Sequence, residues 1–126
     1  MKREIKFRAY SSHNHKMYPV SNIEWDIDGH IWVTADDGKN GIELIDEEAH
    51  LMQYTGLHDK NGREIYEGDV VKNEYGKVME VQYDPRSAAF GVGDYYFGTI
   101  GSGKTLEVIG NIFEDKQLLE GKHEQK

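Results

Sequence analysis

The close spacing of turn signals is the feature that most constrains what this chain can fold into. Clusters of Gly, Asn and Asp interrupt short apolar runs at intervals of about eight to twelve residues, a spacing typical of all-β barrels and sandwiches. The chain holds 14 Gly but only 2 Pro, which suits tight turns and sharply coiled strands. Within most runs apolar and polar residues alternate, as in half-buried strands. We therefore expect a mainly β fold.

The clearest predicted hairpin is WDIDGHIWV, residues 25–33. Apolar and acidic residues alternate before its turn, and Asp28-Gly29 is a strong signal of a two-residue hairpin loop. The chain then returns over Ile31–Thr34. An earlier strand pair is expected around the polar turn at 11–15, with its second strand interrupted at Pro19, because proline cannot donate to a ladder.

The second half of the chain has the same pattern of short strands separated by turn residues. Strands are expected over Leu51–Leu57, Val78–Tyr83 and Leu106–Phe113. Gly110 lies inside the last of these strands and predicts a bulge or a close approach of another backbone. The one segment with helical character is Asp115–Glu120, which precedes a glycine. We expect a small barrel-like fold with N-terminal β-hairpins and one short C-terminal helix.

A chain of 126 residues predicts one domain, residues 1–126, with a possible seam near 36–50. There is no Cys, which fits a reducing compartment. No apolar run approaches the ~20 residues of a membrane span. The N-terminus has charges but no apolar stretch behind them, so it does not resemble a secretory signal. We expect a cytoplasmic protein without membrane contact.

The net charge of −8 is unevenly distributed. Residues 1–20 carry five basic and one acidic side chain, whereas residues 21–50 carry one basic and nine acidic side chains. The overall deficit of positive charge argues against general binding to phosphate backbones, which needs clustered Lys and Arg. A local basic patch from the N-terminal segment stays open as a nucleic-acid hypothesis; its residues are Lys2, Arg3, Lys6 and Arg8. The acidic stretch is either a solvated face, a surface for a cationic partner or a mimic of nucleic acid.

GTIGSGKT, residues 98–105, matches the phosphate-binding loop pattern G-x-x-x-x-G-K-[ST]. Such a loop requires a buried strand before it and a long helix after it. Here LEVIGNIF follows, whose β-branched residues and alternation favour a strand. Only 21 residues follow Thr105, too few for the parallel strands of a nucleotide-binding domain. We predict a glycine-rich turn between two antiparallel strands and no nucleotide cofactor.

No complete catalytic constellation is present. His13-x-His15 could supply two metal ligands, but further ligands at usable spacing are missing, so no metal site is predicted. The chain lacks a G-x-S-x-G elbow. Its 23 acidic residues make a chance pair of carboxylates expected, which leaves a small metal-dependent hydrolase or nuclease as an alternative. One set of aromatic residues either stacks bases or fills the core and its rim; these are Tyr54, Tyr66, Tyr75, Tyr83, Tyr95, Tyr96 and Phe97.

Three stretches carry a resemblance to a known family: IKFRAY at 5–10, LMQYTGLHDKNGREIYEGDVV at 51–71 and EVIGNIFEDKQLLEG at 107–121. In this order they resemble segments of the YopX family of phage and prophage proteins. Tyr10 stands where the family usually has Trp, and Asp115-Lys116 stands where it usually has Asn-Pro. The resemblance implies a small, mainly β phage or prophage protein acting in the host cytoplasm, with no established catalytic residue.

The resemblance also implies a turn at Asp59–Gly62 and, from Tyr66 to Asp69, a strand entry similar to that of SH3-like barrels. Our leading hypothesis is a non-enzymatic binding module for a host or phage macromolecule, with protein as the first expectation and nucleic acid as the alternative. Self-association is also possible through exposed sheet edges. The residues expected on an interaction surface are Lys6, Arg8, Tyr54, Arg63, Tyr66 and Asp69.

Overall fold

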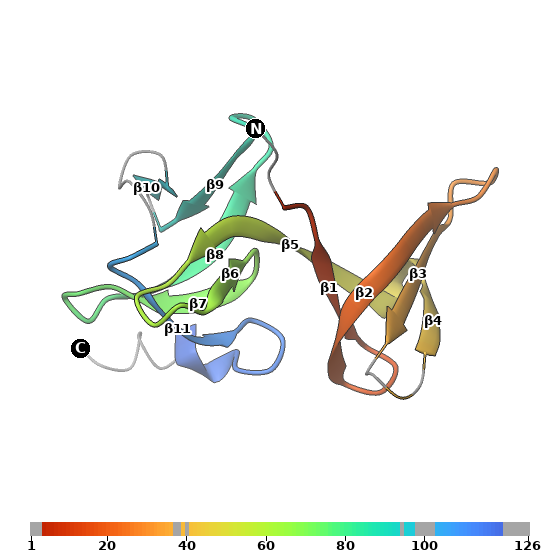
Figure 1. Ribbon diagram of the computed structural model, residues 1–126, viewed down its shortest axis with the longest axis horizontal. Coiled ribbons are helices and arrows are strands. Elements are labelled where there is room, and N and C mark those ends of the chain that lie inside the picture. Colours follow the sequence, from red (N-terminus) through yellow and green to blue (C-terminus); the bar gives the residue numbers. More distant parts are fainter. Residues whose placement is uncertain (1–3, 37–38, 40, 94, 98–102, 120–126) are drawn as a thin grey trace. The chain divides into compact units, whose positions relative to one another are not determined.

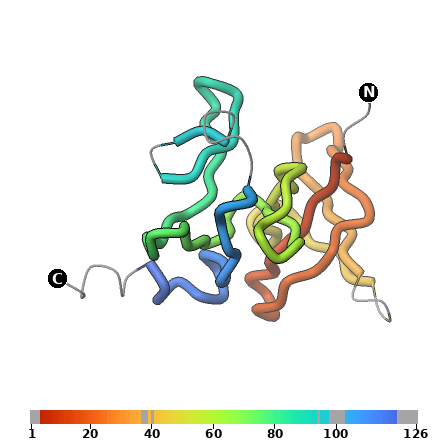
Figure 2. The backbone as a smooth tube through the Cα atoms, turned by 60° about the vertical axis from the view of Figure 1, so that its left-hand side comes forward, coloured from red at the N-terminus to blue at the C-terminus, as the bar shows by residue number. Residues whose placement is uncertain are grey.

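The computed structural model describes residues 4–36, 39, 41–93, 95–97 and 103–119 of the chain (Figure 1). The chain divides between Gln53 and Tyr54 into two compact units. We call residues 4–53 the N-terminal unit and the described residues from 54 to 119 the C-terminal unit. In Figure 2 the first runs from red to yellow and the second from green to blue. The division lies just after the stretch 36–50, where the sequence predicted a seam.

The N-terminal unit is an antiparallel sheet with the strand order β4-β3-β2-β1-β5. β5 contributes its first half to this sheet, through pairs such as Leu51 with Ala9. The core lies on one face of the sheet, where Ala9, Val33 and Leu44 are buried. The elements are β1 (Phe7–Ser11), β2 (Lys16–Trp25), β3 (Ile31–Asp36), β4 (Gly41–Ile45), the 3₁₀ turn η1 (Asp46–Glu48) and β5 (Ala49–His58).

The predicted interruption at Pro19 is wrong, because β2 runs through it without a break. β2 pairs with β1 only up to Pro19 and with β3 only from Val20 onward. A bulge between Val20 and Asn22 marks this change of partner. The proline therefore stands where one ladder ends, a place where its missing N–H is tolerated.

The C-terminal unit holds a five-stranded antiparallel sheet with the order β10-β9-β8-β7-β11, and β6 pairs with the second half of β5. Residues 117–119 are helical, within the predicted helix. The mainly β prediction is confirmed, but no closed barrel is found among the described residues, so SH3-like character stays a prediction. The strands are β6 (Glu64–Tyr66), β7 (Asp69–Lys72), β8 (Val78–Asp84), β9 (Ala89–Val92), β10 (Tyr95–Tyr96) and β11 (Glu107–Asn111).

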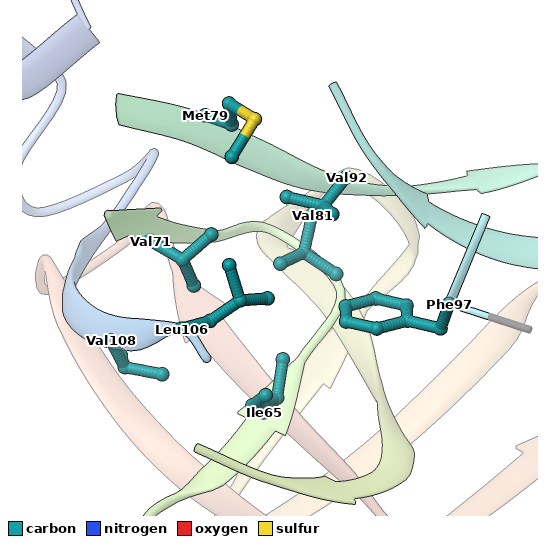
Figure 3. Packing of buried hydrophobic residues seen from close by; sticks show 8 residues of the cluster. All are labelled: Ile65, Val71, Met79, Val81, Val92, Phe97, Leu106 and Val108. Carbon is teal, nitrogen blue, oxygen red and sulfur yellow. The ribbon is translucent and has the colours of Figure 1, made fainter. Parts of the chain in front are cut away.

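The core of the C-terminal unit gathers one side chain or two from each of several strands. Figure 3 shows these side chains pointing toward one another around Leu106. Apolar burial of this kind contributes about 1.5–3 kcal/mol for each large side chain. Gly103 lies against this core, since an added Cβ would collide with Ile65 and lie 2.7 Å from the His58 carbonyl oxygen. The buried cluster comprises Ile65, Val71, Met79, Val81, Val92, Phe97, Leu106 and Val108.

One turn design occurs three times, at residues 26–30, 59–63 and 73–77. In each, an Asp or Asn side-chain oxygen accepts the N–H groups two and four residues later, at 2.9 Å. The fourth residue is Gly29, Gly62 or Gly76, each with φ between 85 and 88°, which glycine adopts without steric cost. The predicted hairpin at 25–33 is confirmed, but its two-residue loop is wrong, because Asp26 extends the turn to five residues.

A second structural turn joins β6 to β7. Asp69 Oδ2 accepts the Tyr66 N–H at 2.7 Å and so closes the turn on itself. Gly68, with φ 90°, donates its N–H to Val81 and accepts the N–H of Ile112 through its carbonyl oxygen. This turn fastens β8 and the end of β11 to the same four residues.

The end of β11 has the irregularity predicted from Gly110. The pairing with β7 shifts register between Val108 and Gly110, which confirms the bulge. An added Cβ at Gly110 would lie 2.7 Å from the Asp115 carboxyl carbon, so the chain that follows packs directly on this glycine. Asn111 then caps the turn, because its Oδ1 accepts the N–H groups of Phe113 and Glu114.

The phosphate-loop lookalike lies partly outside the described residues, at 98–102. Its described end, residues 103–105, forms a turn in which the Leu106 N–H donates to the Gly103 carbonyl oxygen at 3.0 Å. Strand β11 follows at Glu107. The predicted strand is therefore confirmed, and the long helix that a phosphate-binding loop requires does not follow this sequence.

Candidate interaction site

The six residues predicted for an interaction surface are divided between the two units. Lys6 and Arg8 belong to the N-terminal unit. Lys6 Nζ lies 3.2 Å from the Glu4 carboxylate, and the Arg8 guanidinium donates to the Met52 sulfur at 3.7 Å. Both cations are thus engaged within their own unit.

The other four predicted residues lie in the C-terminal unit, where they hold strands together. Tyr54 and Tyr66 face each other across β5 and β6, with ring centroids 5.5 Å apart. Tyr54 is only 3% exposed and Asp69 only 1% exposed. The structure thus gives Tyr54 and Asp69 interior positions, and an interaction surface at Arg63 and Tyr66 stays a prediction.

Arg63, itself an exposed residue, contacts a junction built around the buried Asp59. The Arg63 guanidinium donates to the Val108 carbonyl oxygen at 3.1 Å, while the Val108 N–H donates to Asp59 Oδ2 at 2.9 Å. Burial raises the pKa of Asp59, but the N–H groups of Val108, Arg63 and Asn61 outweigh it and leave the pKa below its ordinary value. The carboxylate is therefore charged at neutral pH and fastens the β5–β6 turn to β11.

Exposed aromatic surface in the C-terminal unit comes from a different group of residues. Tyr75 is 85% exposed in the β7–β8 turn, and Tyr95 is 55% exposed in β10. They border a groove of about 320 Å³, which we call the tyrosine groove. Core side chains reach its floor, and polar residues complete its rim. Its lining residues are Asn73, Glu74, Tyr75, Lys77, Met79, Val92, Tyr95, Thr105 and Leu106.

A second hollow of about 530 Å³ also has Tyr95 in its wall; we call it the polar hollow. Gly91 allows a close approach of the Tyr95 backbone, because an added Cβ would lie 2.8 Å from the Tyr95 carbonyl oxygen. The Arg86 side chain stands at the edge of the polar hollow, almost fully exposed. The lining residues are Gln82, Tyr83, Asp84, Pro85, Arg86, Gly91, Gly93, Tyr95 and Tyr96.

Asp84 is the fixed charge of the polar hollow. The Tyr96 hydroxyl donates to Asp84 Oδ2 at 2.6 Å, and the Arg86 N–H donates to Oδ1 at 2.9 Å. The hydrogen bond from Tyr96 is the largest cause of a pKa below the ordinary value for Asp84, followed by that from Arg86. The Tyr96 ring, which lines the polar hollow, is thereby held in one orientation.

The sequence identified these tyrosines only as members of a larger aromatic group. The structure separates that group, since Tyr54 and Phe97 are buried whereas Tyr75, Tyr83, Tyr95 and Tyr96 are each at least 39% exposed. The exposed tyrosines could have been identified in the sequence from their positions, because Tyr75 lies inside a turn of the recurring type and Tyr95-Tyr96 follows a Gly-rich connection.

Within the described part of the chain, no three His, Asp or Glu side chains are grouped so that they could hold a metal ion. None of the helical residues there belongs to a helix long and apolar enough to cross a bilayer.

Comparisons with known proteins place the chain in a family. Among solved structures, the crystal structure of protein EF1440 from Enterococcus faecalis is similar, with a TM-score of 0.62 and 25% sequence identity over 94% of this chain and 99% of that chain. No curated protein matches. The family described as YopX protein matches residues 6–120. This chain therefore belongs to the YopX family.

Proposed function

We propose that this protein is a non-enzymatic interaction module whose C-terminal unit binds a protein through the tyrosine groove. The observation that carries the proposal is the groove itself: the exposed Tyr75 and Tyr95 line it together with the core residues Met79, Val92 and Leu106. Exposed tyrosine over an apolar floor is typical of protein interfaces, where aromatic residues are enriched and charged residues depleted at the centre.

The size and surroundings of the groove support a protein segment as its occupant. At about 320 Å³ the groove is at the small end of ligand sites, which span roughly 300–1,000 Å³, so it suits apolar side chains of a partner. Tyrosine loses little conformational entropy when it is buried, because it has only two side-chain torsions. The adjacent polar hollow adds the Asp84 carboxylate and the exposed Arg86 as rim contacts.

The partner we propose is a host or phage protein in the cytoplasm, as the family resemblance implied. Photo-cross-linking tests this, with a benzophenone amino acid at position 75 in cells that make the protein. The captured partner is then purified, and its affinity is measured by calorimetry. Tyr75→Ser and Tyr95→Ser should each weaken binding by about tenfold or more, as central interface residues do.

Ile5→Ser is the matched control, because Ile5 is also a large apolar residue that is exposed but lies in the N-terminal unit. Binding that survives both groove substitutions, or cross-linking from position 75 only to nucleic acid, would show the proposal to be wrong. The nucleic-acid alternative has less support, since Lys6 is paired with the Glu4 carboxylate and the net charge of the chain is −8. Two further residues of that hypothesis, Lys2 and Arg3, lie outside the described residues. A salt titration decides this alternative, because affinity for phosphates falls as salt rises.

A further inference from the structure

The tip of the β2–β3 hairpin carries an apolar surface of its own. Ile27 is fully exposed at 101% and Trp25 is 68% exposed, although Val33 of the same hairpin is completely buried. In Figure 1 the orange loop between β2 and β3 stands at the far end of the hairpin. Scattered exposed apolar residues are normal, whereas two large ones placed two residues apart, one at the end of β2 and one in the loop that follows, point to an interaction site.

The tip is held in one conformation. The Asp26 carboxylate accepts the N–H groups of Asp28 and His30 and the Trp32 indole N–H, each at 2.9 Å. A second carboxylate, Asp46 from η1, accepts the Ile31 N–H at 2.9 Å and lies 2.7 Å from His30 Nδ1. Little ordering is therefore needed when another molecule covers the tip, which favours binding.

The two sister turns show that the turn itself does not require these apolar residues. Position 27 corresponds to Lys60 in the turn at 59–63 and to Glu74 in the turn at 73–77. Position 25 corresponds to His58 and Lys72. The same backbone is thus built with polar residues at both positions elsewhere in this chain, so Trp25 and Ile27 are not explained by folding.

Charge indicates what covers the tip. Residues 4–53 carry ten acidic and four basic side chains, and the residues flanking the apolar pair are acidic. Exposed carboxylates near the tip attract cations and repel anionic lipid headgroups, nucleic acid and a second copy of the same tip. The exposed acidic residues are Glu24, Asp28, Asp46 and Glu47.

We infer that the β2–β3 tip is a second docking site, which inserts Ile27 and Trp25 into an apolar pocket on a protein surface rimmed by Lys and Arg. The apolar pair supplies the buried centre of the contact, and the acidic residues supply its orientation and rate. This site lies in the N-terminal unit and the tyrosine groove in the C-terminal unit, so the two proposed contacts use different residues.

Cross-linking from position 27 tests the inference. A benzophenone amino acid replaces Ile27 in the full-length chain, with the same replacement at Lys60 as the matched control in the sister turn. We expect position 27 to capture a protein through a peptide of net positive charge, well above the yield from position 60. Products formed only with lipid, with a second copy or with an acidic peptide overturn the inference, as does a yield equal to that of position 60.

The purified partner then gives the quantitative test. Ile27→Lys copies the sister turn and should keep the fold, as judged by circular dichroism, while weakening binding by about tenfold or more. For the wild-type protein, raising salt from about 50 to about 500 mM should also weaken binding, because surface charges are screened. Tyr75→Ser should leave this contact unchanged. Salt-independent affinity, or wild-type affinity in Ile27→Lys, refutes the inference.

Sedimentation with phosphatidylcholine vesicles, with and without phosphatidylserine, tests whether the tip binds a membrane instead. We expect no sedimentation of the protein with either kind of vesicle. Sedimentation that Ile27→Lys abolishes would instead assign the tip to a lipid surface and overturn the protein-docking inference.

Discussion

Replacement of Asp59 by Asn isolates one hydrogen bond of the buried junction between the β5–β6 turn and β11. Asp59 is 4% exposed and uses Oδ1 for the two turn bonds and Oδ2 for the Val108 N–H. Asn keeps an oxygen for the turn, as Asn73 does in its sister turn. It places an NH₂ group against the Val108 N–H, so two donors then face each other.

The magnitude follows from the bond that is lost. A hydrogen bond to a charged acceptor contributes about 1.5–3 kcal/mol, and a buried N–H without an acceptor costs about 1–3 kcal/mol. These quantities overlap, and we expect Asp59→Asn to lower the free energy of unfolding by about 2–4 kcal/mol. For a chain of this length the melting temperature should fall by roughly 8–16 °C.

Asn73→Asp is the matched control, because it makes the reverse exchange in a turn whose side chain accepts only the two turn bonds at Oδ1. Its effect should stay within about 0.5 kcal/mol. Urea unfolding measures both variants, and hydrogen exchange at the Val108 amide locates the loss. Equal effects of the two substitutions would refute the assignment of the stability to the Val108 bond.

The pH dependence supplies a further check on Asp59. Its pKa is lowered in the folded protein, so its contribution is present above the unfolded pKa of about 3.9 and disappears as pH falls through the lower folded pKa. The stability difference between wild type and Asp59→Asn should therefore be constant near neutral pH and shrink below about pH 4.

Three further predictions test other features. Gly103→Ala should destabilise the C-terminal unit by about 1–3 kcal/mol in urea unfolding, because the added Cβ has no room. Lys104→Ala should alter neither stability nor nucleotide binding. Saturable, Mg²⁺-dependent ATP binding that is lost in Lys104→Ala would contradict the assigned turn. Ala88 has φ 53°, so Ala88→Gly should raise stability by about 0.5–1 kcal/mol, and a loss would show that this backbone conformation is wrong. The hydrogen bond to Asp46, with the charge of that carboxylate, raises the pKa of His30. NMR titration should find the His30 pKa above about 6.5, and Asp46→Asn should lower that pKa; an unshifted pKa would exclude the pair in solution. The stability from this pair is present below about pH 6.5 and is lost as pH rises through the folded pKa.

The sequence predicted most strands but not the geometry of their turns. Asp28-Gly29 resembles a two-residue loop, and only the side chain of Asp26, two residues earlier, makes a longer turn more favourable. The useful signal is Asp or Asn three residues before Gly, which also marks Asp59 and Asn73. Local turn propensity depends on the glycine, whereas the side-chain hydrogen bonds that favour the longer turn can be identified only in the structure.

The candidate sites were harder to predict than the strands. Alternation identifies which residues share a face but not whether another element covers that face, so Tyr54 and Tyr75 look equivalent in the sequence. Tyr54 is covered in the structure and Tyr75 is not. Trp25 likewise continues the apolar alternation of its strand, and nothing local indicates that the core ends before it. The identity of the partners that we propose for the tyrosine groove and the β2–β3 tip depends on the surfaces of those partners and not on this chain alone.

The division of β5 between the two units has a consequence for synthesis on the ribosome. The N-terminal unit is contiguous, and its last strand is the half of β5 that pairs with β1. Its ladder can therefore be completed before residues from β6 onward have left the ribosomal tunnel, since domains fold as units during synthesis. The second half of β5 would then emerge from a folded sheet already extended, as a template on which β6 can pair.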